Sequence, residues 1–283
     1  MTPRLVADPA QLSINAATLW TSCDLRQAVD ALARHGIHGF APWRHRVTEV
    51  GLKEAARLIR GAGLTVSGLC RGGMFPALEA SARRAAIDDN LRAIDEAAAL
   101  DARCLVIVSG GLPAGSRDIG GARAMVRDGL GAILDHAMAS GVPLAIEPLH
   151  PMSAAERCCV NTLKQALDIC DALDPSGSGA IGVAVDVYHV WWDPELQAQI
   201  ARAGQERLHA FHICDWLVPT RDLTFDRGMM GDGVIDIPLI RSWMQAQGYR
   251  GMHEVEIFSK DDWWTRDVDE VLRICKSRHR DLC

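Results

Sequence analysis

Four polar residues stand at the ends of successive apolar segments in the second half of the chain, and together they could bind a metal ion. They are Glu147, Asp186, His212 and Glu256. A carboxylate that has left water needs a cation, a metal ion or hydrogen bonds to compensate its burial. Three converging carboxylates would repel one another, and a divalent cation removes that conflict. The alternative is a set of separate ion pairs or capped strand ends.

The donor atoms of these four residues indicate which kind of ion they would bind and which kind of reaction that ion would promote. Three carboxylates and one imidazole suit Mn²⁺, Mg²⁺ or Co²⁺ better than a structural zinc site, so we expect one divalent ion, with Mn²⁺ first and Zn²⁺ as a further candidate. Such an ion would acidify the C–H between a bound carbonyl and its adjacent hydroxyl by stabilising the enediolate. Glu147 and Glu256 could flank the substrate and move that proton. If the proton returns to the same carbon from the opposite face, the reaction is an epimerisation. If it returns to the neighbouring carbon, the reaction is an isomerisation, and if a β-substituent leaves instead, the reaction is an elimination by a lyase.

Alternating apolar and amphipathic segments predict the elements that position these residues. Apolar runs predict strands over residues 12–20, 37–43, 64–70, 104–109, 143–149, 181–187, 208–214 and 251–258. Helical spacing predicts helices over residues 24–35, 49–61, 80–100, 119–140, 162–173, 194–203, 237–247 and 263–279. Strict alternation implies parallel pairing and fits an α/β fold, a closed (β/α)8 TIM barrel, better than an open sheet. The composition does not shift along the chain, so we expect a single domain over residues 1–283.

The expected barrel brings the four polar residues to one end. Catalytic groups of such barrels lie at the carboxyl ends of the strands, which is where the last four predicted strands carry them. Small or apolar residues lie two positions away, as expected for side chains that point into a barrel: Ala145, Ala184, Ala210 and Cys214. Glu254 shares the parity of Glu256, so we expect it deeper in the barrel with a salt-bridged role.

The overall composition narrows the classes of partner. A formal net charge of −6 argues against a nucleic-acid-binding surface. No segment approaches the roughly 18 apolar residues of a membrane span. The N-terminus lacks a basic region followed by an apolar one, so we expect no secretion signal and a cytoplasmic protein. The nine cysteines include no CxxC pair and several lie in apolar runs, which predicts a reducing compartment without a disulfide framework.

Motifs around these positions carry a family resemblance. They are IEPL at Glu147, VDVYH from Val185 to His189, HICD at His212, the RGMMGDGVID loop that opens at Arg227, and GYRGMHEVEIF around Glu256. Together they resemble the xylose isomerase-like TIM-barrel superfamily, and most closely its sugar phosphate isomerase/epimerase branch of ketose 3-epimerases, hydroxypyruvate isomerases and inosose dehydratases. The resemblance implies that the four polar residues bind one divalent metal and that Glu147 and Glu256 form the acid/base pair. It also implies that His189 and Arg227 contact oxygens of a sugar or polyol substrate.

Further residues near the strand ends are candidates for substrate binding. Trp20 and Trp43 belong to a group of tryptophans at the expected mouth, and aromatic faces suit the C–H faces of sugars, although ordinary loop packing is the alternative. Arg71 could hold a carboxylate or phosphate, or form an internal ion pair. His150 stands where the epimerases often have asparagine, and Met230 stands where the loop usually has proline.

Three classes of function fit the pattern. The first is a metal-dependent isomerase or epimerase, the second a lyase on a keto-polyol or 3-keto-glycoside, and the third a barrel that binds a ligand without catalysis. AP endonucleases share the barrel but use histidines on the third and fourth strands for further zinc ions. Those strand ends carry Cys70 and Ser109 here, so we do not expect phosphodiester chemistry. The chain could also form a homo-oligomer.

Overall fold

The computed structural model describes residues 7–283. Residues 1–6, which belong to the predicted domain and to the segment expected to lack a secretion signal, lie outside the described residues. Within the described part, one sheet has the strand order β3-β2-β1-β11-β8-β7-β6-β5-β4. Its strands are β1 (Leu12–Asn15), β2 (Gly39–Ala41), β3 (Thr65–Val66), β4 (Leu69–Gly73), β5 (Leu105–Val108), β6 (Leu144–Ile146), β7 (Ile181–Asp186), β8 (Leu208–Ile213) and β11 (His253–Val255). A separate antiparallel pair is formed by β9 (Asp215–Trp216) and β10 (Arg227–Gly228).

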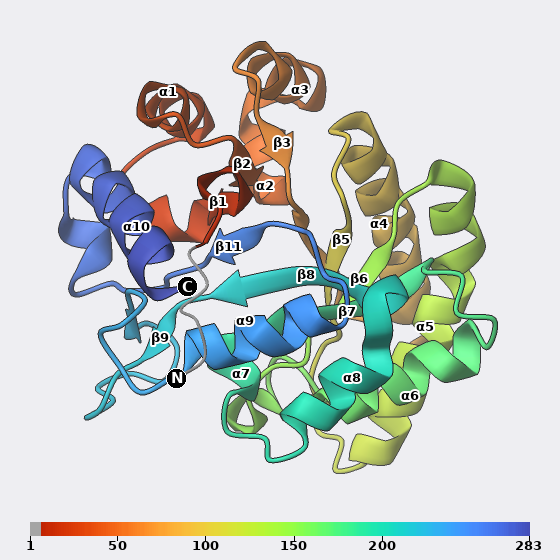
Figure 1. Ribbon diagram of the computed structural model, residues 1–283. Coiled ribbons are helices and arrows are strands. Elements are labelled where there is room, and N and C mark those ends of the chain that lie inside the picture. Colours follow the sequence, from red (N-terminus) through yellow and green to blue (C-terminus); the bar gives the residue numbers. More distant parts are fainter. Residues whose placement is uncertain (1–6) are drawn as a thin grey trace.

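All neighbouring strands of the large sheet are parallel, and the sheet closes into a barrel. A parallel bridge between Trp43 and Cys70 links the segment after β2 to β4. Figure 1 shows the strands in the middle of the molecule with helices around them. The predicted TIM barrel is confirmed. The third predicted strand is present as two pieces, β3 and β4, because the pairing changes from β2 to β5 near Ser67.

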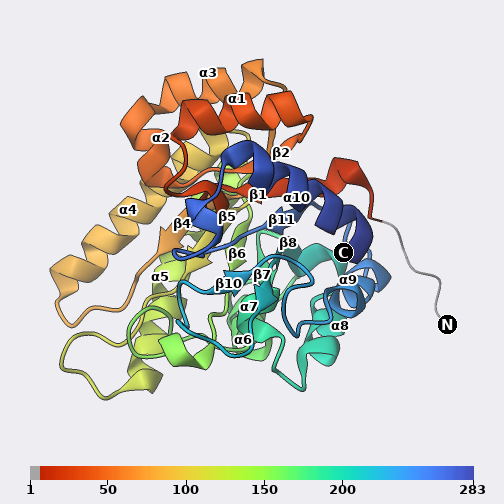
Figure 2. The ribbon, with the colours of Figure 1, turned by 90° about the vertical axis from the view of Figure 1, so that its left-hand side faces the viewer.

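The helices cover the outside of the barrel, as a second view also shows (Figure 2). They are α1 (Leu25–His35), α2 (Arg44–Val50), α3 (Leu52–Gly61), α4 (Ala80–Ala99), α5 (Ile119–Ser140), α6 (Leu163–Leu173), α7 (Val187–Val190), α8 (Leu196–Arg207), α9 (Ile237–Ala246) and α10 (Val268–Leu282). Short 3-10 turns are η1 (Pro9–Gln11), η2 (Ala16–Leu19), η3 (Pro151–Ser153) and η4 (Trp263–Thr265). The last helix, α10, packs against the first, α1.

Local polar groups and glycines set several element ends differently from the prediction. The first strand stops at Asn15, because the side chain of Asn15 accepts a hydrogen bond from the N–H of Ala17 and starts the η2 turn. The helix predicted over residues 49–61 is two helices, because Gly51 has a φ of 89°, outside the helical region. The last helix begins at Val268, where the side chain of the preceding aspartate caps its first N–H groups.

Small side chains fill the barrel interior below the mouth. Ala145, Ala184 and Ala210 pack together with three further buried residues, which are Cys70, Cys104 and Val106. The inward orientation predicted for the alanines is therefore confirmed. Among the described residues, no helix is long and apolar enough to cross a bilayer.

Candidate functional site

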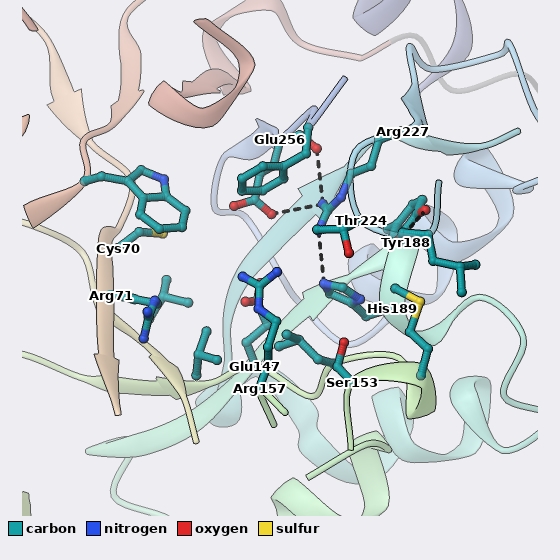
Figure 3. A pocket seen from close by; sticks show the side chains of 17 residues that line it. Cys70, Arg71, Glu147, Ser153, Arg157, Tyr188, His189, Thr224, Arg227 and Glu256 are labelled. Carbon is teal, nitrogen blue, oxygen red and sulfur yellow. Dashed lines mark hydrogen bonds and ion pairs between the residues drawn. The ribbon is translucent and has the colours of Figure 1, made fainter. Parts of the chain in front are cut away.

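A pocket that is open to solvent at its mouth lies at the carboxyl ends of the strands. Its lining includes two acids, Glu147 and Glu256, and four basic residues, which are Arg71, Arg157, His189 and Arg227. Figure 3 shows these side chains converging on the same space from different elements. The pocket therefore combines acid and base groups at the end of the barrel where the catalytic groups were expected.

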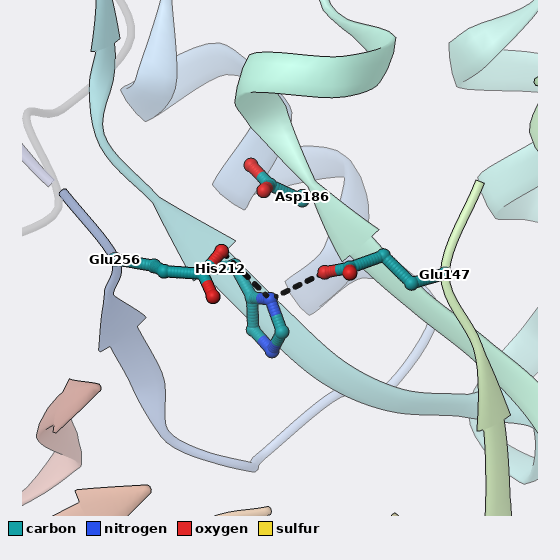
Figure 4. Close-up of side chains that lie close together, drawn as sticks. All are labelled: Glu147, Asp186, His212 and Glu256. Carbon is teal, nitrogen blue, oxygen red and sulfur yellow. Dashed lines mark ion pairs between the residues drawn. The ribbon is translucent and has the colours of Figure 1, made fainter. Parts of the chain in front are cut away.

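Neighbouring strands carry the four residues predicted to bind a metal, which we call the cluster. Glu147 directly follows β6 and Asp186 ends β7. His212 lies in β8 in register with Asp186, and Glu256 directly follows β11. All four are buried, and one possible ligand atom from each lies within 4.8 Å of those of the others. Figure 4 shows the four side chains directed toward a common centre.

Three atoms of the cluster lack a hydrogen-bond partner within residues 7–283, which are Oε1 of Glu147 and both ring nitrogens of His212. Nδ1 of His212 lies 2.8 Å from Oε1 of Glu147 and 3.8 Å from Oε2 of Glu256. Neither Nδ1 of His212 nor Oε1 of Glu147 forms a hydrogen bond, although the two atoms are close. Buried polar atoms without partners are costly. A divalent ion between them would satisfy both, and the donor set of three carboxylates and one imidazole fits such an ion.

Glu254 lies next to the cluster, deeper in the barrel, as its parity predicted. It pairs in register with His212, and its Oε1 is 3.4 Å from Nε2 of that ring. Its carboxylate also accepts hydrogen bonds of 2.7 Å from Asn15 Nδ2 and of 2.7 Å from Ser67 Oγ. The partners of Glu254 are thus an imidazole, an amide and a hydroxyl. Contacts of this kind on the far nitrogen of a ligand histidine fix the orientation of its ring.

Arg227 supplies a positive charge to the cluster from β10. Its Nη1 donates to Asp186 Oδ2 at 2.9 Å and to Glu256 Oε2 at 3.1 Å. Burial alone would raise the pKa of Asp186, but the charge of Arg227 outweighs it and lowers that pKa. The ring of Tyr188 lies 4.5 Å from the guanidinium and supports its plane. Arg227 is therefore bound to the cluster as well as exposed to the pocket.

Burial and neighbouring charges also shift the pKa values of the other cluster residues. Burial raises the pKa of Glu256 to about 8, with Arg227 opposing the rise and Glu147 adding to it. Burial alone would lower the pKa of His212, but the carboxylates of Glu254 and Glu147 raise it well above its ordinary value. Binding of a cation to His212 must therefore release a proton.

His189 lies between two hydrogen-bond donors. Its Nε2 is 3.0 Å from Arg227 Nη2, and its Nδ1 is 3.2 Å from the backbone nitrogen of His150. Burial lowers the pKa of His189 to about 3, so its ring is neutral. A neutral imidazole accepts through one nitrogen alone. Only one of the two N–H groups can therefore bond to the ring, and the other is available to another acceptor.

The remaining predicted substrate contacts lie around the mouth. Trp43 and Arg71 line the pocket itself. Trp20 meets Trp43 edge-on, with ring centroids 5.2 Å apart, and lines an adjoining hollow that shares Trp43 and Arg71 with the pocket. His150 lies outside the pocket lining, where its ring packs against neighbouring tryptophans. Its contact with the pocket runs through its backbone N–H to His189.

Two residues of the site were not identified from the sequence. Asn15 donates from Nδ2 to Glu254 at 2.7 Å and to Glu256 at 3.1 Å, and its Oδ1 accepts from Trp43 Nε1 at 2.7 Å. A polar residue in an inward-facing position of the first strand was the available signal. Arg157, in the loop after η3, lines the pocket, and nothing in its sequence neighbourhood indicates this.

Known proteins share this arrangement of elements. The protein SMc04130 from Sinorhizobium meliloti 1021 is 59% identical, with 98% of this chain and 99% of that chain covered and a TM-score of 0.94. The IOLI protein, in a structure with a binding zinc atom, is 19% identical, with 96% and 97% covered and a TM-score of 0.82, and shares the fold. The inosose isomerase of Halalkalibacterium halodurans is 28% identical over 139 residues, which are 48% of this chain and 46% of that protein. The match to this curated relative thus spans about half the length of each.

A family comparison covers a larger part of the chain. Residues 29–277 match the sequence profile of the family described as xylose isomerase-like TIM barrel. This span includes the whole cluster, and the observed barrel agrees with the family's fold. The chain therefore belongs to the xylose isomerase-like TIM barrel family.

Proposed function

We propose that this protein is a divalent-metal-dependent isomerase or epimerase that acts on a sugar or keto-sugar by moving the proton beside a carbonyl. The proposal is carried by the cluster, whose possible ligand atoms lie within 4.8 Å of one another next to the pocket. The similarity to an inosose isomerase and the zinc atom of the IOLI structure support the same class of chemistry.

The cluster residues would hold the ion, with Mn²⁺ as the first candidate, and the bound ion would stabilise negative charge that develops on a substrate oxygen. Glu147 and Glu256 would transfer the proton. They follow β6 and β11, which are the outer two of four adjacent strands, so they approach from opposite sides of the cluster (Figure 4). A carboxylate on each side suits removal of a proton from one face and its return to the other, which favours epimerisation.

His189 and Arg227 would bind and orient the substrate. Two N–H groups face the ring of His189, one from Arg227 and one from the backbone of His150. The neutral ring accepts only one of them, so the second remains available. A substrate oxygen in the pocket is a suitable acceptor for that N–H. Trp43 adds an aromatic face beside the same space.

Elimination is a second candidate because it shares the first proton transfer. The observation that favours it is the hollow that adjoins the pocket and is lined by Trp20, Trp43, His45 and Arg71. A leaving group of a keto-polyol or 3-keto-glycoside could occupy this hollow while the carbonyl lies at the cluster. The two reactions give products that proton NMR separates.

Incubation with ketoses and keto-inositols in D₂O tests the proposal. The Mn²⁺-loaded protein should incorporate deuterium at the carbon beside the carbonyl, and proton NMR should identify an epimer, an isomer or an elimination product. The double variant Glu147→Gln, Glu256→Gln is the matched control, since it keeps an oxygen donor at both positions but has no carboxylate left to transfer the proton. Absence of deuterium incorporation from the metal-loaded protein with every candidate would contradict the proposal.

Other expectations stay predictions. They are a small-molecule substrate with no nucleic-acid partner, a location in the cytoplasm, the possibility of a homo-oligomer and a single domain over residues 1–283.

A further inference from the structure

Two arginines of the pocket have no partner in the described part of the chain. Arg71 lies in β4, and Arg157 lies in the loop between η3 and α6. Both line the pocket together with Glu147. Neither guanidinium forms a hydrogen bond or an ion pair within residues 7–283. In Figure 3 Arg71 lies on the side of the pocket away from His189, and Arg157 lies between them.

A bulge in β4 directs Arg71 into the pocket. Cys70 pairs with Val106 and Gly72 pairs with Ile107, so Arg71 is an extra residue between two consecutive pairs. A bulge of this kind re-aims a side chain, and such bulges are common next to active sites. The backbone thus places Arg71 at the pocket without the help of a salt bridge.

The nearby charges leave the two arginines uncompensated. The third pocket arginine, Arg227, is paired with carboxylates of the cluster, and Glu147 faces His212. Burial and then the positive charge of Arg157 lower the pKa of Arg71, so the surroundings disfavour its charge. The guanidinium of Arg71 is half-buried, so it has lost part of its hydration without gaining a partner, whereas Arg157 is exposed and adds positive charge beside it. A ligand with negative charge would remove this cost.

We propose that Arg71 and Arg157 bind an anionic group of the substrate, either a carboxylate or a phosphate. The planar fork of a guanidinium matches both groups in a bidentate geometry. The inference rests on the proposed function and narrows it to a keto-sugar or keto-polyol that carries a negative charge. Its carbonyl lies at the cluster and its anionic group lies toward β4.

Equilibrium binding to the Mn²⁺-loaded protein tests this inference with related neutral and anionic probes. The probes are D-fructose, D-fructose 6-phosphate and 5-keto-D-gluconate. The wild-type protein should bind at least one anionic probe about tenfold or more tightly than D-fructose. Arg71→Gln and Arg157→Gln should each reduce that preference, and the double variant should abolish it while its affinity for D-fructose stays unchanged. Since neither guanidinium has a protein partner, the variants should keep the thermal stability and metal content of the wild type.

The control is Arg273→Gln, which removes an exposed arginine of α10 outside the pocket and should change nothing. The anionic probe that loses affinity in the double variant tells a carboxylate from a phosphate. Absence of any anion preference in the wild type overturns the inference. A preference that survives in the double variant also overturns it, because the anion would then bind at the metal.

Deuterium exchange of the same probes is measured separately. Exchange without anion preference leaves the proposed function standing, whereas anion preference without exchange counts against the proposed function alone.

Discussion

Nδ1 of His212 and Oε1 of Glu147 lie 2.8 Å apart at the centre of the barrel mouth, yet neither atom is hydrogen-bonded in the described part of the chain. An ion that takes both atoms as ligands satisfies two buried polar groups at once. We therefore expect one divalent ion per chain. Its affinity should fall at lower pH, because His212 must lose a proton to bind it.

Replacement of His212 by alanine should abolish metal retention, because it removes the nitrogen donor of the cluster. The measurement is the metal content per chain after dialysis against Mn²⁺ and then against metal-free buffer. His209→Ala is the matched control, since His209 lies in the same strand but outside the cluster. Full occupancy in His212→Ala protein would exclude this residue as a ligand.

Replacement of Glu147 or Glu256 by glutamine should lower turnover about 10²–10⁴-fold with metal still bound at saturating concentration. Glutamine retains an oxygen donor but cannot exchange a proton. One of the two variants should still exchange the substrate proton with solvent in the direction that its intact partner serves. Glu79→Gln, at an exposed position before α4, is the control. Recovery of near-normal turnover on adding metal would mean that both glutamates are ligands alone.

Arg227→Gln should raise KM about tenfold or more without loss of metal. The variant loses a charged donor to the substrate, while removal of a positive charge beside Asp186 and Glu256 does not weaken their attraction for a cation. Steady-state kinetics and metal analysis on the same preparation check both parts. The exposed Arg221, which pairs with Asp226, provides the control Arg221→Gln. Loss of metal from Arg227→Gln protein would show that this loop holds the cluster together.

A buried histidine pair away from the cluster should make stability depend on pH. Nδ1 of His253 and Nε2 of His279 lie 3.0 Å apart, where β11 meets α10. Burial lowers the pKa of His253 to about 3 and that of His279 to about 4. Both lie below the value of about 6.5 in an unfolded chain, so between about pH 6.5 and pH 4 the unfolded chain binds protons that the folded chain does not. As the pH decreases through this window, the free energy of unfolding should decrease as well. The loss should be up to about 1.4 kcal/mol for each pH unit and for each of the two histidines.

Urea unfolding at about pH 7.5 and about pH 5 measures this dependence. The His279→Gln variant should lose less stability on acidification than the wild type, because one titrating group is gone. His136→Gln, on the exposed face of α5, should behave as the wild type does. An identical pH dependence in all three proteins would assign the effect to other groups.

The sequence was sufficient to predict the barrel and the position of the cluster. Each cluster residue ends an apolar run, and in a chain of alternating strands and helices such ends meet at one face. Glu254 could be placed below Glu256 for a related reason, since side chains alternate along a strand. These predictions depend on local periodicity alone.

The supporting contacts depend on the tertiary structure and could not be predicted. Asn15 reaches Glu254, which is 239 positions away along the chain. Arg157 comes from an irregular loop, whose path no periodicity fixes. The break at Gly51 depends on a backbone conformation that a glycine permits but does not require.

The cluster and part of the mouth come from different halves of the chain. The cluster, His189 and Arg227 all come from β6 onward, whereas Trp20, Trp43 and Arg71 come from the first half of the chain. Asn15 links the two halves through its hydrogen bonds to the acids of β11 and the segment after it. Changes to the mouth-lining residues of the first half can thus alter what enters the pocket while the reacting groups keep their places. Substitutions confined to the first half therefore leave all four cluster residues in place.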